Sequence, residues 1–314
     1  MTFEEFKDIW DNTDSHVAVR TSGSTGEPKI IQLSKEFMKE SALRTNSFFN
    51  VKSSSRLHSC VSPDFIGGKM MAVRAEEAGC ELTWETPSNR PELRDLENKT
   101  ITLLAAVPSQ MEAICRLDAD KISKIENIII GGAKINKALR EKIEDSGLKA
   151  FETYGMTETA SHIALRRVKK EEEWFLCLDG IKVYPDERGC IRIEFASGEK
   201  IITNDLGEFK NDREFKLKGR VDNIINTGGI KVNPIELERK IESIVDKPFI
   251  ITAEEDEKWG NRPVLKIEDD QIYGKDEDEK LMKELKRILK PYEVPKRIVR
   301  VKEFKRTPNG KVMR

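Results

Sequence analysis

Short apolar runs alternate with amphipathic stretches along the first half of the chain. The runs have the length of β-strands, and the segments between them have the three- and four-residue apolar spacing of helices. Parallel strands need helical crossovers, so this alternation predicts an α/β fold with a large, doubly wound, mostly parallel sheet. The predicted strands lie at residues 57–61, 81–84, 101–107, 125–130 and 149–153, and the helices between them at residues 68–79, 108–117 and 136–147.

Two helices are expected before the first of these strands. Phe3, Phe6 and Trp10 recur at helical spacing and predict a short amphipathic helix at the start of the chain. Ser34 suits the N-cap of a second helix that runs to about residue 50. We expect this second helix to bury four side chains, namely Phe37, Met38, Leu43 and Phe48.

The pattern changes after residue 174. Closely spaced short strands with turn residues between them predict an attached antiparallel roll over residues 174–218. Further on, Gly228 and Gly229 separate two short apolar runs, which is typical of a hairpin. Helices and strands then alternate to the end as a small α+β unit. We therefore predict an N-terminal domain of residues 1–221 and a small, mobile C-terminal lid of residues 222–314.

Composition excludes several classes of partner. Lys and Arg number 55 against 56 Asp and Glu, so no global field favours nucleic acid or a membrane surface. Neither a membrane span nor a secretory signal is recognisable, and we expect a cytoplasmic protein without membrane insertion. The five cysteines form no C-x-x-C pair and are expected to be reduced. The three histidines are scattered along the sequence, and their spacing does not indicate a metal-binding cluster.

A loop rich in hydroxyl groups and glycine follows the apolar run at residues 17–19. Glycine permits a tight turn, and hydroxyl and backbone N–H donors suit phosphate oxygens. A flexible Ser/Gly linker is the alternative, against which Pro28 argues. The common G-x-x-x-x-G-K-[ST] phosphate loop does not fit, because Lys29 follows Pro28. The candidate phosphate-binding residues are Thr21, Ser22, Gly23, Ser24, Thr25, Gly26 and Lys29.

Two further motifs follow predicted strands. Because ligands of such sheets bind at the carboxyl ends of the strands, one crevice is expected to gather these motifs with the glycine-rich loop. The motifs are Gly131-Gly132-Ala133 and Tyr154-Gly155-Met156-Thr157-Glu158.

Together with three later motifs, these segments resemble the AMP-forming adenylating enzymes, the acyl-CoA synthetases and their relatives. The resemblance spans residues 21–311 and implies an acid–thiol ligase that uses ATP, Mg²⁺ and coenzyme A. Members of that family carry a longer segment before the phosphate loop, so a reduced N-terminal subdomain is expected. The later motifs are Thr203-Asn204-Asp205, residues 219–234 with Glu236 and Glu238, and Pro308-Asn309-Gly310-Lys311.

The resemblance implies roles around the triphosphate. Glu158 is the candidate Mg²⁺ anchor, and Thr157 adds a hydroxyl to the α-phosphate. A plain helix-start carboxylate is the alternative for Glu158. Arg220 suits a phosphate contact. Lys311 is the candidate catalytic cation, because one anion must attack another during adenylation. The alternative is a frayed, irrelevant lysine near the chain end.

The same resemblance implies contacts to the nucleoside and to CoA. The Tyr154 ring covers adenine or is a core aromatic, and Gly155 follows it. Gly131 and Gly132 allow main chain against the purine or simply end a strand. Asp205 binds the ribose hydroxyls or belongs to an Asn-Asp turn. Asp222 is the expected hinge, and Gly228 and Gly229 are expected to border the CoA tunnel.

Residues 65–75 and 152–166 resemble the short o-succinylbenzoate-CoA ligases of menaquinone biosynthesis. Such ligases act on an aromatic dicarboxylic acid, whose second carboxylate needs a countercharge. Lys69 is the candidate countercharge, with a solvated lysine as the alternative. Ser161 and His162 are candidates for the aryl pocket, although His162 also fits a core histidine.

Three functional hypotheses follow. The first is an o-succinylbenzoate-CoA ligase, and the second is a ligase for another aryl or acyl acid that delivers it to CoA or to a carrier protein. The third is a non-catalytic nucleotide-binding relative, which the presence of Glu158, Asp205, Arg220 and Lys311 opposes. A homodimer formed over an open sheet edge is a further hypothesis.

Overall fold

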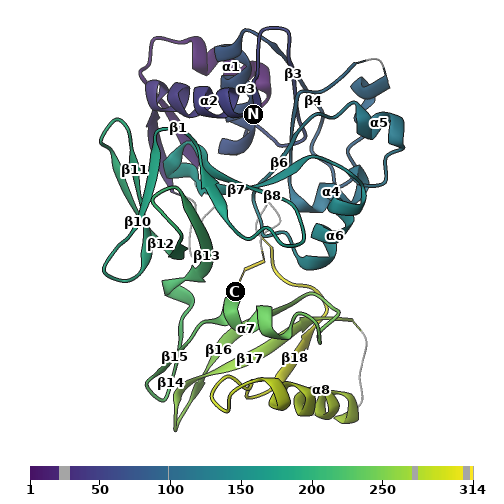
Figure 1. Cartoon of the computed structure of the whole chain (residues 1–314), viewed down its shortest axis with the longest axis vertical. Helices are drawn as coiled ribbons and strands as arrows, with labels where there is room; N and C mark the ends of the chain where they lie inside the picture. Colours follow the sequence, from purple (N-terminus) through teal and green to yellow (C-terminus); the bar gives the residue numbers. More distant parts are fainter. Residues whose placement is uncertain (21–28, 98, 271–274, 307–311, 314) are drawn as a thin grey trace. The chain divides into compact units, whose positions relative to one another are not determined.

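The computed structural model describes residues 1–20, 29–97, 99–270, 275–306 and 312–313 (Figure 1). These residues divide into two compact units, and each is described by itself. The first comprises residues 1–182 and 194–201, and the second comprises residues 183–193 and 202–306 with Val312 and Met313. The predicted domain boundary after residue 221 falls within the second unit. The division of the chain there into two moving domains stays a prediction.

The first unit is built on the predicted sheet. Seven strands of this eleven-stranded sheet lie wholly in the first unit, in the order β9-β8-β7-β6-β5-β3-β4. Neighbours from β4 to β7 pair in parallel, and β8 and β9 continue the sheet antiparallel. The large, mostly parallel sheet is thereby confirmed. The strands are β3 (Arg56–Ser59), β4 (Glu81–Trp84), β5 (Leu103–Ala106), β6 (Ile128–Ile130), β7 (Ala150–Met156), β8 (Ser161–Arg167) and β9 (Phe175–Cys177).

Helices cover both faces of this sheet. In Figure 1, α2 and α3 lie on one side, and α4 and α6 lie on the other. Apolar side chains of α4 and α6, such as Met111 and Ile143, join buried residues of β5 and β6 in one core. The helices are α1 (Phe3–Asp11), α2 (Lys35–Phe49), α3 (Ile66–Ala78), α4 (Pro108–Ile114), α5 (Ala119–Ser123) and α6 (Lys137–Asp145), with short 3₁₀ turns η1 (Arg94–Glu97) and η2 (Thr157–Thr159).

Helix α2 begins where the sequence predicts. The Ser34 hydroxyl accepts a hydrogen bond from the Phe37 N–H at 3.2 Å, and the helix ends at Asn50 in the left-handed conformation. Phe37 and Met38 are buried as expected. The expectation for Leu43 and Phe48 is wrong, because their side chains are 51% and 41% exposed. The buried stripe instead runs through Ser41, Ala42, Thr45, Asn46 and Phe49.

Two paired strands flank the hydroxyl-rich loop in the sequence. Strand β1 (His16–Arg20) pairs antiparallel with β2 (Ile30–Ser34), and Val17 and Val19 are buried. The apolar run at residues 17–19 therefore belongs to strand β1. Residues 21–28 fall between β1 and β2 in the sequence.

Antiparallel strands follow the first sheet in sequence, as expected for a roll. The boundary between the two units runs through β10, β11 and β12. Strands β12 and β13 pair antiparallel with a register shift between Leu206 and Gly207. The four strands are β10 (Ile181–Pro185), β11 (Cys190–Phe195), β12 (Lys200–Phe209) and β13 (Glu214–Arg220).

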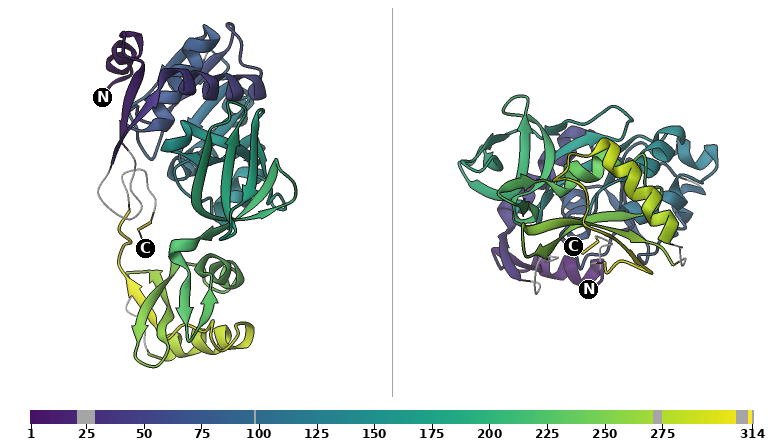
Figure 2. Two further views of the ribbon diagram at one scale, coloured as in Figure 1. Left: turned by 90° about the vertical axis from the view of Figure 1, so that its left-hand side faces the viewer. Right: turned by 90° about the horizontal axis from the view of Figure 1, so that it is seen from below.

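The rest of the second unit is a small α+β fold. Its sheet follows the order β15-β14-β17-β16, with β18 parallel to β17, and both helices contribute to the core beneath it (Figure 2). The predicted glycine hairpin is confirmed by the pairing of β14 with β15. The elements are β14 (Ile225–Thr227), β15 (Ile230–Val232), α7 (Pro234–Ile241), β16 (Phe249–Asp256), β17 (Gly260–Glu268), α8 (Lys275–Ile288) and β18 (Ile298–Val301), preceded by the 3₁₀ turn η3 (Val221–Asn223).

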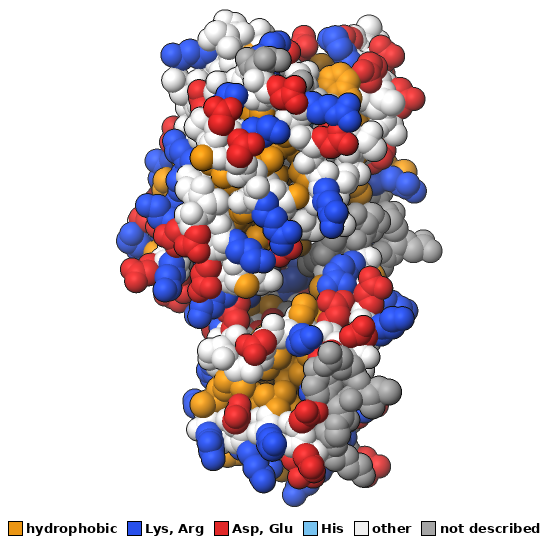
Figure 3. Space-filling model, turned by 90° about the vertical axis from the view of Figure 1, so that its right-hand side faces the viewer, with side chains coloured by type: hydrophobic (Ala, Val, Ile, Leu, Met, Phe, Trp, Pro, Cys, Tyr) orange, Lys and Arg blue, Asp and Glu red, His pale blue; other side chains and the backbone are white. Residues whose placement is uncertain are grey.

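The described surface matches the balanced composition. Basic and acidic side chains are interspersed on the face drawn in Figure 3. No helix among the described residues is long and apolar enough to cross a membrane. All five cysteines are free, as predicted.

Candidate functional site

Part of the predicted site lies outside the described residues. This applies to Lys311 and to six residues of the glycine-rich loop, namely Thr21, Ser22, Gly23, Ser24, Thr25 and Gly26. Lys29 is exposed and directly precedes β2. The phosphate-binding role of this loop and the catalytic role of Lys311 therefore stay predictions.

The loop after β6 approaches β7 closely. A Cβ atom on Gly131 would lie 2.9 Å from Thr153 Oγ1, so this position needs a glycine unless the threonine moves. Gly132 has a φ of 87°, which favours glycine. Ala133 is half-buried. The loop thus exposes main chain at the carboxyl end of β6, as the sequence predicts for a purine contact, and the contact itself stays a prediction.

The junction of β7 and β8 contains a bulge. The register shifts between Tyr154 and Gly155, and a Cβ atom on Gly155 would collide with the backbone of Ser161 and His162. The Tyr154 ring is buried and lies 6.0 Å from the Phe175 ring, centroid to centroid. This packing agrees with the alternative of a core aromatic, and the contact of the Tyr154 ring with adenine stays a prediction.

The connection from β7 to β8 is tightly constrained. Thr157 is buried and Glu158 is exposed on η2. Ala160 and Ser161 have φ values of 48° and 85°, an uncommon conformation for residues with a Cβ atom. The Ser41 hydroxyl donates to the Ala160 carbonyl at 2.8 Å and helps to hold it. Strained non-glycine residues of this kind cluster at functional sites.

A buried guanidinium faces this strained segment. Arg74 on α3 is fully buried, and its Nη2 lies 3.3 Å from Ser161 Oγ. Its Nη1 contacts the Met71 sulfur at 3.6 Å. No carboxylate among the described residues forms an ion pair with it. Burial lowers the pKa of Arg74 to about 9, which leaves the group charged at neutral pH.

His162 lies beside Arg74 in the same interior. Its Nε2 is 3.0 Å from Thr45 Oγ1 on α2. Burial, together with the charge of Arg74, holds the pKa of His162 well below its usual range. The ring is therefore neutral, and the place of Ser161 and His162 in an aryl pocket stays a prediction. We name Arg74, Ser161 and His162 the Arg74 cluster.

The depressed pKa of His162 predicts a pH dependence of stability. Between its folded pKa and the ordinary value of about 6.5, the unfolded chain binds more protons than the folded chain. The free energy of unfolding should therefore fall as pH decreases below about 6.5. Urea unfolding at pH 7.5 and 5.5 should show a smaller loss in His162→Gln than in the unaltered chain. A His16→Gln control, at an exposed position, should keep the full loss; an unchanged loss in His162→Gln would contradict this prediction.

Lys69 is buried near α1, and its role as the countercharge of a second carboxylate stays a prediction. Its ammonium donates to the Pro63 carbonyl and lies 5.7 Å from the centroid of the Phe6 ring on α1. The side chain is buried, so the alternative of a solvated lysine is wrong. Burial lowers the pKa of Lys69. Arg74, which the sequence pattern did not single out, is the cation found against Ser161.

A buried ion-pair network supports the start of the same junction. The Glu152 carboxylate accepts from Arg140 Nη2 at 3.1 Å and from Arg166 Nη2. All three side chains are at most 13% exposed. The Arg166 guanidinium also lies 4.4 Å from the Phe175 ring centroid, so the network adjoins the Tyr154 packing.

The predicted ribose and hinge residues meet in the second unit. Strand register places Asp205 opposite Arg220, and Arg220 Nη1 lies 3.3 Å from the Asp205 carboxylate. Arg220 Nη2 donates to Asp222 at 2.8 Å. Asn204 donates to the same Asp222 oxygen at 3.2 Å. The structure therefore brings Asp205, Arg220 and Asp222 together, and their roles toward ATP and domain motion stay predictions.

The glycine hairpin is shaped by Trp259. Gly228 has a φ of 56°, its N–H donates to the Trp259 carbonyl at 2.8 Å, and a Cβ atom would lie 2.5 Å from the indole ring. Gly229 has a φ of 83° and open space at its Cβ position. The turn is thus specific for glycine, and its place beside a CoA tunnel stays a prediction.

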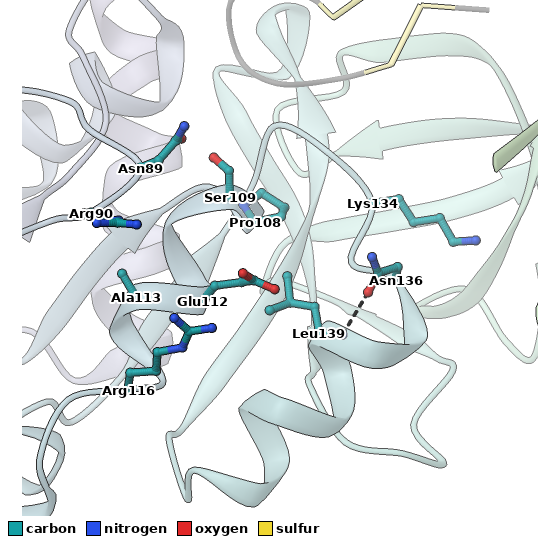
Figure 4. A pocket seen from close by; sticks show the side chains of 10 residues that line it. All are labelled: Asn89, Arg90, Pro108, Ser109, Glu112, Ala113, Arg116, Lys134, Asn136 and Leu139. Carbon is teal, nitrogen blue, oxygen red and sulfur yellow. Dashed lines mark hydrogen bonds between the residues drawn. The ribbon is translucent and has the colours of Figure 1, made fainter. Parts of the chain in front are cut away.

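A polar hollow of about 770 Å³ opens beside α4 and α6 (Figure 4). Its lining includes three basic side chains and one carboxylate, namely those of Arg90, Arg116, Lys134 and Glu112. Asn136, which caps α6 by accepting from the Leu139 N–H at 2.8 Å, lies at its rim. None of the predicted site residues lines this hollow, so we do not assign the adenylate to it.

Comparison with known proteins identifies the family. Residues 5–178 match the family of AMP-binding enzymes. A 2-succinylbenzoate--CoA ligase of Listeria monocytogenes is 25% identical over 99% of this chain and 71% of its own length. An acyl-CoA synthetase (AMP-forming)/AMP-acid ligase II-like protein from Dyadobacter fermentans is 33% identical, with 98% of this chain and 90% of that chain covered and a TM-score of 0.64.

Solved structures of ligases share the fold. The o-succinylbenzoate CoA synthetase of Bacillus subtilis in complex with its acyl-adenylate intermediate has a TM-score of 0.78, at 21% identity over 95% of this chain and 67% of that chain. The chain therefore belongs to the AMP-binding enzyme family, as an adenylate-forming CoA ligase. The predicted membership of the AMP-forming adenylating enzymes is confirmed.

Proposed function

We propose that this chain is an o-succinylbenzoate-CoA ligase. A carboxylate of the acid attacks the α-phosphorus of ATP, forms a mixed anhydride with AMP and releases pyrophosphate. The CoA thiol, after losing its proton, then attacks the acyl carbon, and AMP leaves as the thioester forms. The names of relatives at 24–25% identity support this substrate.

The observation that carries the proposal is the buried Arg74 guanidinium. A buried charge without a partner costs several kcal/mol unless a counterion compensates. No described residue supplies a carboxylate to Arg74, whereas a dicarboxylic acid brings one in addition to the carboxylate that is activated. Arginine suits this task because its planar fork can bind both oxygens of a carboxylate. The second carboxylate of o-succinylbenzoate is therefore assigned to Arg74, with Ser161 and His162 beside the aryl ring.

Four described residues are proposed to bind ATP or Mg²⁺. Glu158 fits Mg²⁺ because its carboxylate is exposed on a short turn, and Mg²⁺ is typically held by one or two carboxylates and substrate phosphates. When bound, Mg²⁺ neutralises charge on the phosphate oxygens. Thr157 and Arg220 are proposed to contact phosphate. Asp205 is proposed to accept hydrogen bonds from the ribose, which requires it to share its carboxylate with Arg220.

A pair of matched acids tests the proposal. Pyrophosphate release should be measured with o-succinylbenzoate and with 4-oxo-4-phenylbutanoate, which lacks only the ring carboxylate. The ring carboxylate should raise kcat/KM by about thirtyfold to several thousandfold, because the loss of a buried charge pair costs about 2–5 kcal/mol. Equal rates with the two acids would contradict the substrate assignment. Pyrophosphate release with neither acid, but with another aryl or acyl acid, would favour the second hypothesis.

The acceptor requires a separate measurement. Thioester formation from the adenylate should proceed with free CoA. A requirement for a carrier protein's phosphopantetheine would favour the sister ligase, and ATP binding without turnover of any acid would favour a non-catalytic relative.

A further inference from the structure

Three metal-ligating side chains gather at the carboxyl ends of β3 and β4. His58 lies on β3, Cys60 directly follows that strand, and Glu85 directly follows β4. One potential ligand atom from each lies within 4.8 Å of the other two. His58 and Cys60 are almost completely buried, and the Glu85 side chain is 20% exposed. None of the three belongs to the Arg74 cluster or to the predicted ATP site.

The distances suit a single small cation. Glu85 Oε1 lies 3.9 Å from His58 Nε2 and 3.3 Å from Cys60 Sγ. Bonds to zinc of about 2.1 Å from nitrogen or oxygen and about 2.3 Å from sulfur span both gaps. In tetrahedral coordination these bond lengths put nitrogen and sulfur about 3.6 Å apart and nitrogen and oxygen about 3.4 Å apart. The nitrogen–sulfur gap of at most 4.8 Å therefore has to close by up to about 1.2 Å, and the nitrogen–oxygen gap of 3.9 Å by about 0.5 Å.

Neighbouring groups orient each ligand. His58 Nδ1 lies 2.8 Å from Thr83 Oγ1, which is positioned to donate its own proton to the Leu57 carbonyl at 3.4 Å. In the tautomer that metal binding requires, Nδ1–H donates to Thr83 Oγ1 and the Nε2 lone pair is directed at the cluster. Hydrogen bonding of this kind to the distal nitrogen is the usual arrangement for metal-binding histidine.

The other two ligands are also held by backbone groups. Glu85 Oε2 accepts from the N–H groups of Glu92 and Leu93 at 2.9 and 3.3 Å, which leaves Oε1 for a metal. The Cys60 N–H donates to the Ala105 carbonyl at 3.0 Å, and the Cys60 carbonyl accepts from Gln110 at 2.9 Å. The ligand set is therefore preorganised by β4, β5 and α4.

We propose that His58, Cys60 and Glu85 form a binding site for one Zn²⁺ ion, with water as the fourth ligand. One thiolate, one imidazole and one carboxylate match the ligand preferences of Zn²⁺. Two negative ligands and one neutral ligand cancel the charge of a divalent ion, which limits the cost of burying it.

Binding must release one proton. In the metal-free protein the Cys60 thiol donates to Glu85 Oε1 at 3.3 Å, so its proton lies between two of the proposed ligand atoms and must leave when the metal binds. The S–H bond breaks as the zinc–sulfur bond forms, and the proton passes to solvent. Glu85 binds through its carboxylate oxygen Oε1 and His58 through Nε2. The bound ion would tie the segment after β4 to the end of β3.

Metal titration of the full chain tests this proposal directly. After treatment with a chelator, the protein should bind one equivalent of Zn²⁺ and release about one proton per ion, measured by calorimetry in buffers of different ionisation enthalpy. One equivalent of Co²⁺ should produce a thiolate-to-cobalt charge-transfer band. Zn²⁺ should also protect Cys60 from alkylation. Failure to bind an equivalent of either ion would overturn the proposal.

Variants locate the site. Cys60→Ser should abolish the charge-transfer band, and His58→Asn and Glu85→Gln should each weaken Zn²⁺ binding by at least about a hundredfold. Thr83→Val, which leaves all three ligands in place, should weaken it by about tenfold to a hundredfold. Cys80→Ser and His16→Gln are matched controls and should bind Zn²⁺ as the unaltered chain does. Tight binding that survives both Cys60→Ser and Glu85→Gln in folded protein would overturn the assignment, whatever the outcome for ligase activity.

Discussion

Replacing Arg74 with methionine should lower kcat/KM for o-succinylbenzoate by on the order of a hundredfold to a thousandfold. The variant removes the cation proposed to bind the second carboxylate, and methionine has similar length without the charge. The same variant should keep or raise the free energy of unfolding, because a buried guanidinium with no described carboxylate partner is removed. Pyrophosphate-release kinetics and urea unfolding measure the two effects.

The control for this prediction is a buried arginine that does have a partner. Arg56 donates to Glu81 at 3.1 and 2.6 Å through Nε and Nη2. Arg56→Met should therefore lower stability and leave the preference between the two matched acids unchanged. For Arg74→Met, kcat/KM with 4-oxo-4-phenylbutanoate should change less than about fivefold. A variant that loses stability and activity toward both acids alike would show that Arg74 is structural.

Replacing Glu152 with glutamine should lower the free energy of unfolding by about 3–5 kcal/mol. Glutamine preserves the shape of the side chain but removes the charge shared by Arg140 and Arg166, which then remain buried without their counterion. A loss of this size is a large fraction of the stability of an ordinary domain. It is measured by urea unfolding at neutral pH.

An exposed ion pair on the same unit provides the comparison. Glu112 lies 2.8 Å from Lys142, and both side chains are about half exposed. Glu112→Gln should change the free energy of unfolding by less than about 1 kcal/mol. If both variants lose the same small amount, the Glu152 network does not stabilise the junction of β7 and β8.

The sequence pattern predicts the sheet better than it predicts the helix surfaces. Short runs such as residues 128–130 are apolar throughout because parallel strands are buried on both faces, and β5 and β6 are buried along their whole length. Helix α2 has a less regular pattern. Its buried stripe passes through Ser41, Thr45 and Asn46, so apolar spacing alone wrongly assigned Leu43 and Phe48 to the interior.

The sequence predicts a site residue only where that residue belongs to a recognisable local motif. Strand pairing brings Asp205 to Arg220, although fifteen residues separate them in the sequence. Arg74 lies in the stretch 65–75 that resembles the o-succinylbenzoate-CoA ligases, but a charge within this apolar helical run is a signal that Lys69 gives equally. Helix packing decides between the two, because it turns Lys69 toward α1 and Arg74 toward β8. The contacts of His58 and Cys60 with Glu85 likewise depend on the alignment of two strands.

The isolation of Arg74 from other charges has an evolutionary consequence. A residue that belongs to a buried ion-pair network, such as Glu152, can change only if its charged partners change with it. Arg74 has no such dependence among the described residues, so one substitution there is expected to switch the accepted acid from a dicarboxylate to a monocarboxylate without compensating mutations. Position 74 is therefore where we expect enzymes with this scaffold to diverge in substrate by single steps.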